Sequence, residues 1–317
     1  MINIYEECRE YNRIGISGHI KPDGDCIGAV LALYLYLNKR LPNAEIIAFS
    51  EEPASCFAYI RGIERFNTNF EVKEAPELMI ALDTVSDRLG GAEKYFQTAR
   101  KTINIDHHIS NASGCGDVNY VDAEASSTSE LIYRLIEPDY IDREIAEALY
   151  LGIVHDTGVF RYSNTSPETL TAAAHLITYG FDFSELIDKT FYEKTYIQNL
   201  ALGRVLLESR LFLDGKLIVG YMDEKTMTQM GLTTKDFDGI INQLRITEGV
   251  ECAAFIYQMN AVTCKVSLRS KGLVDVSAVA VTYGGGGHRR ASGFYVKEDS
   301  ERLIERLVAQ VCESLKA

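Results

Sequence analysis

In the first half of the chain, short apolar runs alternate with segments in which apolar residues recur every three or four positions. The short runs are typical of buried strands, and the recurring pattern is typical of helices that cover a sheet. The predicted strands are Arg13 to Ser17, Glu45 to Phe49, Leu78 to Leu82 and Thr102 to Ile105, and the predicted helices are Gly28 to Lys39, Ser126 to Ile136 and Asp142 to Val154. This order predicts an α/β domain with a mostly parallel sheet, right-handed crossovers and helices on both faces.

The second half of the chain has a different pattern. Residues 167 to 209 predict a nearly continuous helix, interrupted at Gly180. Beyond it, Asp214-Gly215 predicts a hairpin with a type I′ turn, followed by further strands and an amphipathic closing helix from Ser300 to Leu315. We therefore expect a first domain over residues 1–185, a helical linker over 186–208 and a smaller α+β domain over 209–317.

Length and composition limit the class of protein. The chain has 317 residues, which predicts about two domains, and its 46% apolar and 24% charged residues are ordinary for a globular protein. The longest apolar run, Ala29 to Leu37, is too short to span a membrane, and no signal peptide is recognisable. Seven scattered cysteines without a C-x-x-C pair indicate reduced thiols. These features predict a cytoplasmic protein without membrane contact.

The net charge of −13 argues against binding long nucleic acid, which requires a positive face. It is compatible with a short anionic substrate held in a local basic pocket. It also fits a site rich in carboxylates that metal ions neutralise.

Carboxylates and imidazoles gather where the predicted strands end. They are His19, Asp23, Asp25, Asp83, Asp106, His107 and His108, with Asp156 later in the chain. In open parallel sheets the ligand lies outside the carboxyl ends of the strands, so these side chains are expected to converge on one crevice. Such crowded carboxylates repel one another unless cations lie among them. Mixed carboxylate and imidazole ligands suit Mn²⁺ or Mg²⁺, and their number suffices for the two ions used in phosphoryl displacement.

Five segments of the chain carry a family resemblance. HIKPDGDCIG, ALDTVSDRLG, IDHH and GIVHDTGVF resemble the four motifs of the DHH phosphoesterase family, and GGGGHRRASG, preceded by SLRSK, resembles the signature of its DHHA1 domain. The motifs occur in the expected order over nearly the whole chain. Within the family, the chain is most similar to the standalone bacterial oligoribonucleases that also dephosphorylate 3′-phosphoadenosine 5′-phosphate.

The resemblance implies a role for each residue of the constellation. One divalent ion would be held by His19, Asp23 and Asp83, and a second by Asp25, Asp83, His107 and Asp156, with Asp83 bridging. Asp106 would orient a histidine, and His108 would face the substrate phosphate. The two ions implied are Mn²⁺, with Mg²⁺ as the alternative.

The resemblance also implies that the second domain holds the substrate. Between Lys265 and Arg290 the chain has five basic residues and one acidic residue, which reverses the overall charge locally. The expected substrate-binding residues are Arg269, Gly284, Gly285, Gly286, Gly287, His288 and Arg289. Glycine amides can approach a phosphate without a Cβ in the way.

Several structural interpretations remain beside the functional ones. Pro22-Asp23-Gly24 is also a turn signal, and Ser126-Ser127-Thr128 could bind a phosphate or simply cap a helix. His155 and His175 are expected to be structural. Some of the 18 tyrosines could stack on bases, but the sequence does not say which.

The leading functional hypothesis is a two-metal phosphoesterase acting on short RNA and on 3′-phosphoadenosine 5′-phosphate. The alternatives are a phosphodiesterase for cyclic di-AMP or linear pApA, a pyrophosphatase or polyphosphatase, and an inactive nucleotide-binding module. The expected partners are a short RNA or nucleotide substrate, and a homodimer is left open.

Overall fold

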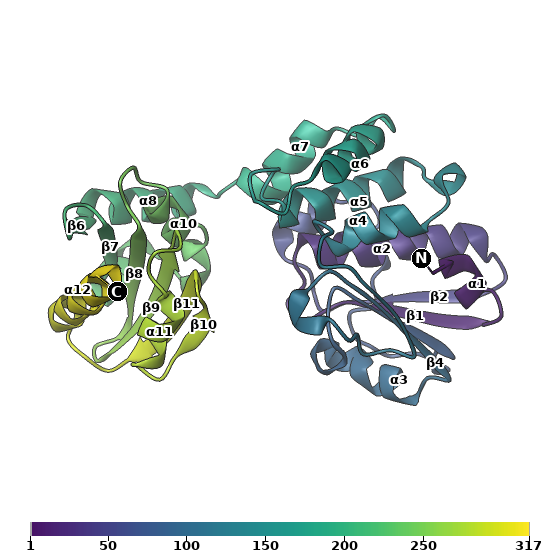
Figure 1. The fold of residues 1–317 in the computed structure, drawn as a ribbon, viewed down its shortest axis with the longest axis horizontal. Helices are drawn as coiled ribbons and strands as arrows, with labels where there is room; N and C mark the ends of the chain where they lie inside the picture. Colours follow the sequence, from purple (N-terminus) through teal and green to yellow (C-terminus); the bar gives the residue numbers. More distant parts are fainter. Residues whose placement is uncertain (1, 317) are drawn as a thin grey trace. The chain divides into compact units, whose positions relative to one another are not determined.

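The computed structural model describes residues 2–316, which form two compact units that meet between Glu193 and Lys194. The sheet of the first unit has five parallel strands in the order β2-β1-β3-β4-β5 (Figure 1). Its strands are β1 (Arg13–Ser17), β2 (Glu45–Phe49), β3 (Leu78–Leu82), β4 (Lys101–Asp106) and β5 (Val118–Val121). The edge strand β5 was not predicted, because its half-exposed residues lack a clear apolar pattern.

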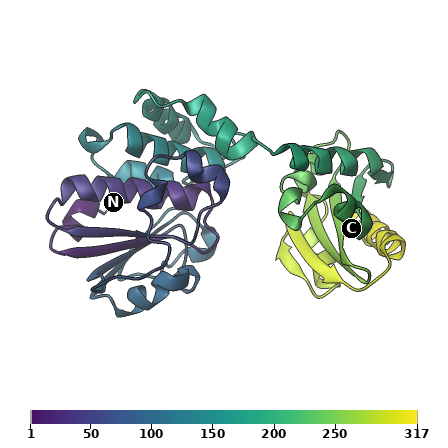
Figure 2. The ribbon, with the colours of Figure 1, turned by 180° about the vertical axis from the view of Figure 1, so that it is seen from behind.

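Helices cover both faces of this sheet, as the sequence predicts. They are α1 (Ile4–Cys8), α2 (Gly24–Arg40), α3 (Glu93–Thr98), α4 (Thr128–Leu135), α5 (Arg143–Asp156), α6 (Pro167–Ile177) and α7 (Phe183–Ile187). Figure 2 shows α2, α4 and α5 on one face and α3 on the other. The larger core lies between the sheet and α2, and a smaller one, with Phe49 and Phe96, lies under α3. The α/β fold class is therefore confirmed.

Helix α2 begins at Gly24, four residues earlier than predicted. Asp23 is the reason, because its side chain caps the helix by accepting hydrogen bonds from the amides of Asp25 and Cys26, both at 3.1 Å. The earlier start puts Asp25 in the first turn of the helix. Two of the predicted metal ligands therefore belong to one helix N-terminus.

The sequence predicted a nearly continuous helix over residues 167 to 209, and this prediction is wrong because the segment contains several separate helices. The structure divides it into α6, α7, a π-helix (Asp188–Tyr192) and α8 (Tyr196–Glu208). Gly180 makes one break with a left-handed φ of 75°. The last break follows from a capping box, in which Thr195 and Gln198 each accept a backbone hydrogen bond from the other.

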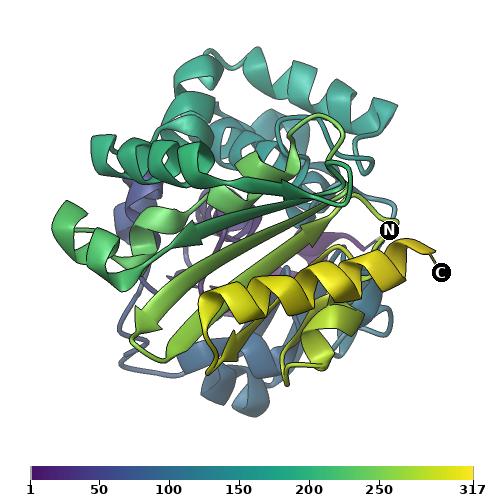
Figure 3. The same cartoon turned by 90° about the vertical axis from the view of Figure 1, so that its left-hand side faces the viewer.

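The second unit contains a mixed six-stranded sheet in the order β10-β11-β9-β8-β7-β6, in which only β7 and β8 are parallel neighbours. Its strands are β6 (Arg210–Phe212), β7 (Leu217–Met222), β8 (Cys252–Asn260), β9 (Thr263–Ser270), β10 (Gly286–His288) and β11 (Ala291–Val296). Besides α8, its helices are α9 (Glu224–Met230), α10 (Ile240–Arg245), α11 (Val276–Val281) and α12 (Ser300–Lys316). Figure 3 shows α12 lying across one face of the sheet. The predicted α+β class of this region is confirmed.

Some details of the second unit differ from the prediction. The hairpin between β6 and β7 has a four-residue connection rather than a two-residue turn, with positive φ at Leu213, Asp214 and Gly215. The last two residues of the glycine run, Gly286 and Gly287, belong to the short edge strand β10, which the sequence did not predict. Within residues 2–316, no helix is both long and apolar enough to cross a bilayer.

Two glycines allow α2 and α5 to cross at close range. A Cβ on Gly28 would lie 2.4 Å from the carbonyl oxygen of Ala148 and 3.0 Å from the amide nitrogen of Gly152. A Cβ on Gly152 would lie 1.9 Å from Ser129 Oγ and 2.6 Å from Asp25 Oδ1. The absence of a side chain at Gly152 therefore also provides the space that the Asp25 carboxylate occupies.

We expect Gly28→Ala to destabilise the first unit by about 1–3 kcal/mol, because the added methyl group overpacks a backbone contact. Gly203→Ala is the matched control, since Gly203 also lies within a helix but a Cβ added there would meet nothing within 4 Å. The control should stabilise the second unit by about 0.5–1 kcal/mol through helix propensity. Calorimetric unfolding measures both changes. A Gly28→Ala protein as stable as the parent would contradict the packing argument.

Candidate metal centre

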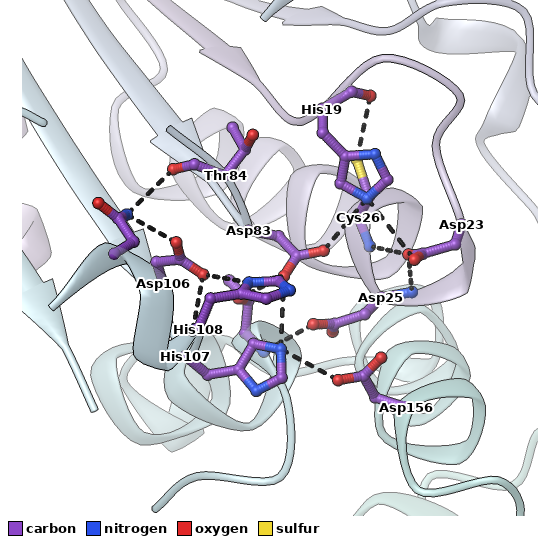
Figure 4. A network of polar contacts seen from close by, with 12 residues as sticks. His19, Asp23, Asp25, Cys26, Asp83, Thr84, Asp106, His107, His108 and Asp156 are labelled. Carbon is purple, nitrogen blue, oxygen red and sulfur yellow. Dashed lines mark hydrogen bonds and ion pairs between the residues drawn. The ribbon is translucent and has the colours of Figure 1, made fainter. Parts of the chain in front are cut away.

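The predicted acidic and imidazole side chains converge at the carboxyl ends of β1, β3 and β4 (Figure 4). The neighbouring ends of α2 and α5 contribute the remaining members. Among the described residues, three groups have ligand atoms that all lie within 4.8 Å of one another. These groups are His19, Asp23 and Asp83; Asp25, His107 and Asp156; and Asp83, His107 and His108.

In the first group, one ring nitrogen of His19 faces two carboxylates. Nε2 lies 3.6 Å from Asp23 Oδ2 and 3.5 Å from Asp83 Oδ2. The other nitrogen, Nδ1, lies 2.8 Å from the carbonyl oxygen of Ile20, to which it can donate its proton. That hydrogen bond favours the tautomer in which Nε2 offers a lone pair to an ion.

The second group joins the end of β4 to α2 and α5. His107 Nε2 lies 3.0 Å from Asp156 Oδ2 at the end of α5. Asp25 completes the group from the first turn of α2, and its side chain is fully buried.

Asp83 lies between the two groups. Its Oδ2 faces His19, while its Oδ1 lies 3.6 Å from His107 Nε2. The residue follows β3 with a left-handed φ of 59°, which is uncommon for a residue other than glycine and is held here by a hydrogen bond from its amide to the Ile105 carbonyl. Each carboxylate oxygen can thus serve a different ion.

Asp106 is held in a buried hydrogen-bond network that orients His108. Its Oδ1 lies 2.7 Å from His108 Nδ1, and its Oδ2 accepts a hydrogen bond from Asn111 Nδ2 at 2.6 Å. Asn111 also donates to Asn104 Oδ1, and Asn104 donates to the carbonyls of Ala81 and Thr84. His108 remains 44% exposed, so its Nε2 is available to a ligand. Sequence reasoning missed both asparagines, because their role depends on tertiary contacts.

The N-terminus of α4 binds a carboxylate of the protein itself. Asp25 Oδ2 accepts from the Thr128 amide at 2.7 Å, and Oδ1 accepts from the Ser129 amide at 2.8 Å. Free amides and the helix dipole stabilise the charged form of this acid. The segment over residues 126–128, which the sequence left open as a phosphate site or a cap, therefore holds Asp25 as well as capping α4 through Ser127.

The crowding of acidic groups in the cluster shifts the pKa values of its members. Burial and the negative charges of Asp83 and Asp156 raise the pKa of Asp25 well above its usual range. Burial also raises the pKa of Asp83. Burial alone would lower the pKa of His19, but hydrogen bonds from its ring to Asp23 and Asp83 raise it to about 10. In the absence of ions, protons therefore compensate part of the negative charge.

The donor set fits divalent cations. Ligand distances of about 2.1 Å around Mg²⁺ put any two ligand atoms within about 4.2 Å of each other, close to the spacing found here. Oxygen and imidazole donors are those of a divalent-metal site, and no cysteine belongs to any of the three groups. Because metal ligands must be deprotonated, binding of an ion here would be coupled to the release of protons from these side chains.

The predicted substrate-binding residues lie in the second unit. Arg269 is on β9, is half-buried, and forms no ion pair within the described part of the chain. Burial and the nearby charge of Arg245 lower its pKa, although a guanidinium remains charged. His288 pairs with Ala291, which in turn pairs with Arg269, so these side chains share one face of the sheet. Arg289 lies in the exposed turn between β10 and β11.

The four glycines differ in what they do. The amides of Gly284 and Gly285 donate to the carbonyls of Val281 and Ala280, so they end α11 rather than point to a ligand. Gly286 and Gly287 belong to β10, and Gly287 has a φ of 145° that favours glycine. The run therefore shapes a helix end and a tight hairpin.

These two units and their acidic centre are those of a known family. The chain belongs to the DHH family: the family model for its N-terminal domain matches residues 13–153, and the model of the DHHA1 domain matches residues 214–317. It is 31% identical to the "Bifunctional oligoribonuclease and PAP phosphatase NrnA" of Thermus thermophilus over 95% of this chain and 90% of that protein. The protein of the same name from Bacillus subtilis is also 31% identical, over 94% of each chain.

A solved structure has the same fold. The crystal structure of an exopolyphosphatase-related protein from Bacteroides fragilis superimposes with a TM-score of 0.86, covering 99% of this chain and 95% of its own, at 23% sequence identity. This likeness concerns the fold.

His155, next to Asp156, is a partly buried residue with a structural role. Its Nε2 lies 3.0 Å from Thr190 Oγ1, and its ring packs between Phe57 and Phe191. A Cβ on Gly24 would lie 2.2 Å from the ring, so His155 fills the space beside the start of α2. Burial lowers its pKa to about 4. The other histidine expected to be structural, His175, bonds to the Tyr133 hydroxyl.

We expect His155→Gln to flatten the pH dependence of stability in metal-free buffer. Unfolded histidine titrates near pH 6.5, so the neutral ring contributes stability above that pH which is lost as the pH falls toward 4. Between pH 7.5 and pH 5 this loss should be on the order of 1–2 kcal/mol, and glutamine should lack it while keeping a donor for Thr190. Urea unfolding of both proteins at the two pH values measures the difference. Parallel pH profiles would contradict a neutral imidazole at this position.

Proposed function

We propose that this protein is a two-metal phosphoesterase that hydrolyses short oligoribonucleotides to mononucleotides and dephosphorylates 3′-phosphoadenosine 5′-phosphate to AMP in the cytoplasm. The observation that carries the proposal is the position of Asp83 between two groups of carboxylate and imidazole ligands. The relatives of the same family, whose names state these activities, support the choice of substrate.

In this proposal, His19, Asp23 and Asp83 hold one ion, and Asp25, Asp83, His107 and Asp156 hold the other. We propose Mn²⁺, with Mg²⁺ as the second choice, because both accept oxygen and imidazole ligands. When bound, the pair of ions would supply an acidified water and stabilise the attacking and leaving oxygens of an in-line displacement.

The remaining residues position the substrate. His108, oriented by Asp106, faces a phosphate oxygen with its exposed nitrogen. In the second unit, Arg269, His288 and Arg289 bind phosphate by charge and hydrogen bonding, and Gly284, Gly285, Gly286 and Gly287 form the backbone beside it. Because the ions would activate the attacking water and these residues would bind the substrate, no covalent nucleophile is required.

A substrate panel tests the proposal. Purified protein with Mn²⁺, Mg²⁺ or a chelator is incubated with di- to pentaribonucleotides, 3′-phosphoadenosine 5′-phosphate, cyclic di-AMP, pApA and pyrophosphate. The proposal expects metal-dependent release of mononucleotides and AMP. Absence of turnover with every ion would overturn it, and a higher kcat/KM on cyclic di-AMP or pyrophosphate would favour those alternatives.

We expect Asp83→Ala to reduce kcat by at least about 10³-fold, because both ions lose a ligand and several kcal/mol of transition-state stabilisation are lost. Calorimetry should also show weaker Mn²⁺ binding. Asp87→Ala is the control, since Asp87 is an exposed acid in the same loop and in none of the three groups. Near-normal activity of Asp83→Ala would show that this carboxylate does not bridge the ions.

We expect His288→Ala to raise KM more than it lowers kcat, because this side chain would bind substrate without touching the ions. Steady-state kinetics on 3′-phosphoadenosine 5′-phosphate separates the two parameters. A loss confined to kcat would instead assign His288 to the chemical step.

A further inference from the structure

The sheet of the second unit has one fully covered face and one that is only half covered. On the covered face, α11 and α12 pack over the core that includes Val266, Leu268 and Phe294. On the other face, α8 and α10 cover β7 and β8, with Phe255 and Leu244 in the contact. Figure 1 shows α10 and α12 on opposite sides of this sheet. The surface that β9, β11 and β10 form beside α10 therefore remains accessible.

Strand register arranges this open surface in three rows. Alternate residues of β9 are partly exposed, and their partners on β8 and β11 share the face. The phosphate row consists of Arg269, Ala291 and His288; the middle row of Ser267, Gly293 and Gly286; and the aromatic row of Tyr257, Lys265 and Tyr295. Ala253 and Phe255, which pair with Arg269 and Ser267 on β8, are buried beneath α8 and α10 and mark the edge of the open surface. None of these residues is acidic, in a chain whose net charge is −13.

The aromatic row presents a ring and a cation together. Tyr295 is 58% exposed, and Lys265 Nζ lies 4.2 Å from the centre of its ring. Lys265 forms no ion pair with any residue in the described range 2–316. At the inner end of the row, the ring of Tyr257 packs against the ring of Phe237, which holds Tyr257 in place. An exposed ring beside an unpaired cation is suited to a stacked base and the phosphate attached to it.

The Lys265 side chain lies over the middle row. A Cβ on Gly293 would lie 3.4 Å from Lys265 Nζ, so the absence of a side chain at Gly293 leaves room for this ammonium group between the aromatic row and the phosphate row. Arg269 and Lys265 are four residues apart on one strand, so their Cα atoms are about 13 Å apart. A phosphate bound at Arg269 and a base stacked at Tyr295 would therefore belong to different nucleotides.

We infer that Tyr295 and Lys265 form a stacking subsite for the base of a further nucleotide, so that this face of the second unit selects oligonucleotides over mononucleotides. The inference rests on the proposed function, since it specifies how that function recognises substrate length. It assigns the base-stacking role, left open by the sequence, to one particular tyrosine.

The test measures how the preference for longer substrates depends on the ring. For Tyr295→Ala, the ratio of kcat/KM on a tetraribonucleotide to that on 3′-phosphoadenosine 5′-phosphate should fall about tenfold, mainly through KM on the tetranucleotide. Tyr295→Phe keeps the ring and should restore the ratio. Tyr196→Ala, which removes an exposed tyrosine from α8 outside the rows, is the matched control. An unchanged ratio for Tyr295→Ala would overturn the subsite.

Binding gives a second readout that does not depend on hydrolysis. Anisotropy of a fluorescein-labelled tetraribonucleotide in a chelator should show weaker binding by Tyr295→Ala and by Lys265→Met, with Lys297→Met as the charge control at the end of β11. Weaker binding by both variants supports the subsite even if the wild-type protein fails to hydrolyse RNA. Equal binding by all variants, or no binding by the wild type, overturns it even if hydrolysis is found.

Discussion

The repulsion among buried carboxylates is the constraint on which the first unit depends. Asp25 and Asp83 are both buried at the end of a sheet, close to Asp156, and burial raises the pKa of both. The fold offsets this cost with fixed hydrogen-bond donors: the amides of Thr128 and Ser129 bind Asp25, and the hydroxyl of Thr128 donates to Asp83. Because these donors satisfy only some of the carboxylate oxygens, the remaining lone pairs stay directed at the space between the side chains. A fold that neutralised every carboxylate internally would leave no reason for a cation to bind.

The same helix crossing serves packing and chemistry. Without side chains at Gly28 and Gly152, α2 and α5 approach closely, and the start of α2 comes near the end of α5. Asp25 and Asp156 belong to these two helix ends, so the distance between them is set by the core rather than by flexible loops. His155 adds a rigid ring at the same place, held by Thr190 and two phenylalanines. The candidate ligands are thus positioned by residues outside the three groups.

Much of this arrangement can be predicted from the sequence because it follows from strand ends. Apolar runs that stop at Asp83 and Asp106 mark the edge of a parallel sheet, and the topology then requires these residues to meet. The sequence could not identify Asn104 and Asn111, whose polar character at buried positions has no periodic signal. Nor could it show that the amides of α4 bind Asp25, since a backbone donor carries no residue identity. The strands β5 and β10 were missed because short, half-exposed edge strands rich in glycine or polar residues lack alternation.

In the second unit, one alternating pattern provides both a hydrophobic core and an open face. Along β9, every second residue enters the core beneath α12, and the intervening residues form an open face that lies outside this core. Register then determines which of those residues become neighbours: Arg269 meets Ala291, Lys265 meets Tyr295, and a glycine lies between the two pairs. A shift of one residue in the pairing would bury the charges and expose Val266 and Leu268, so the hydrophobic core itself fixes the order of the open face. The spacing between Arg269 and Lys265 on this face is therefore a consequence of the same burial that stabilises the unit.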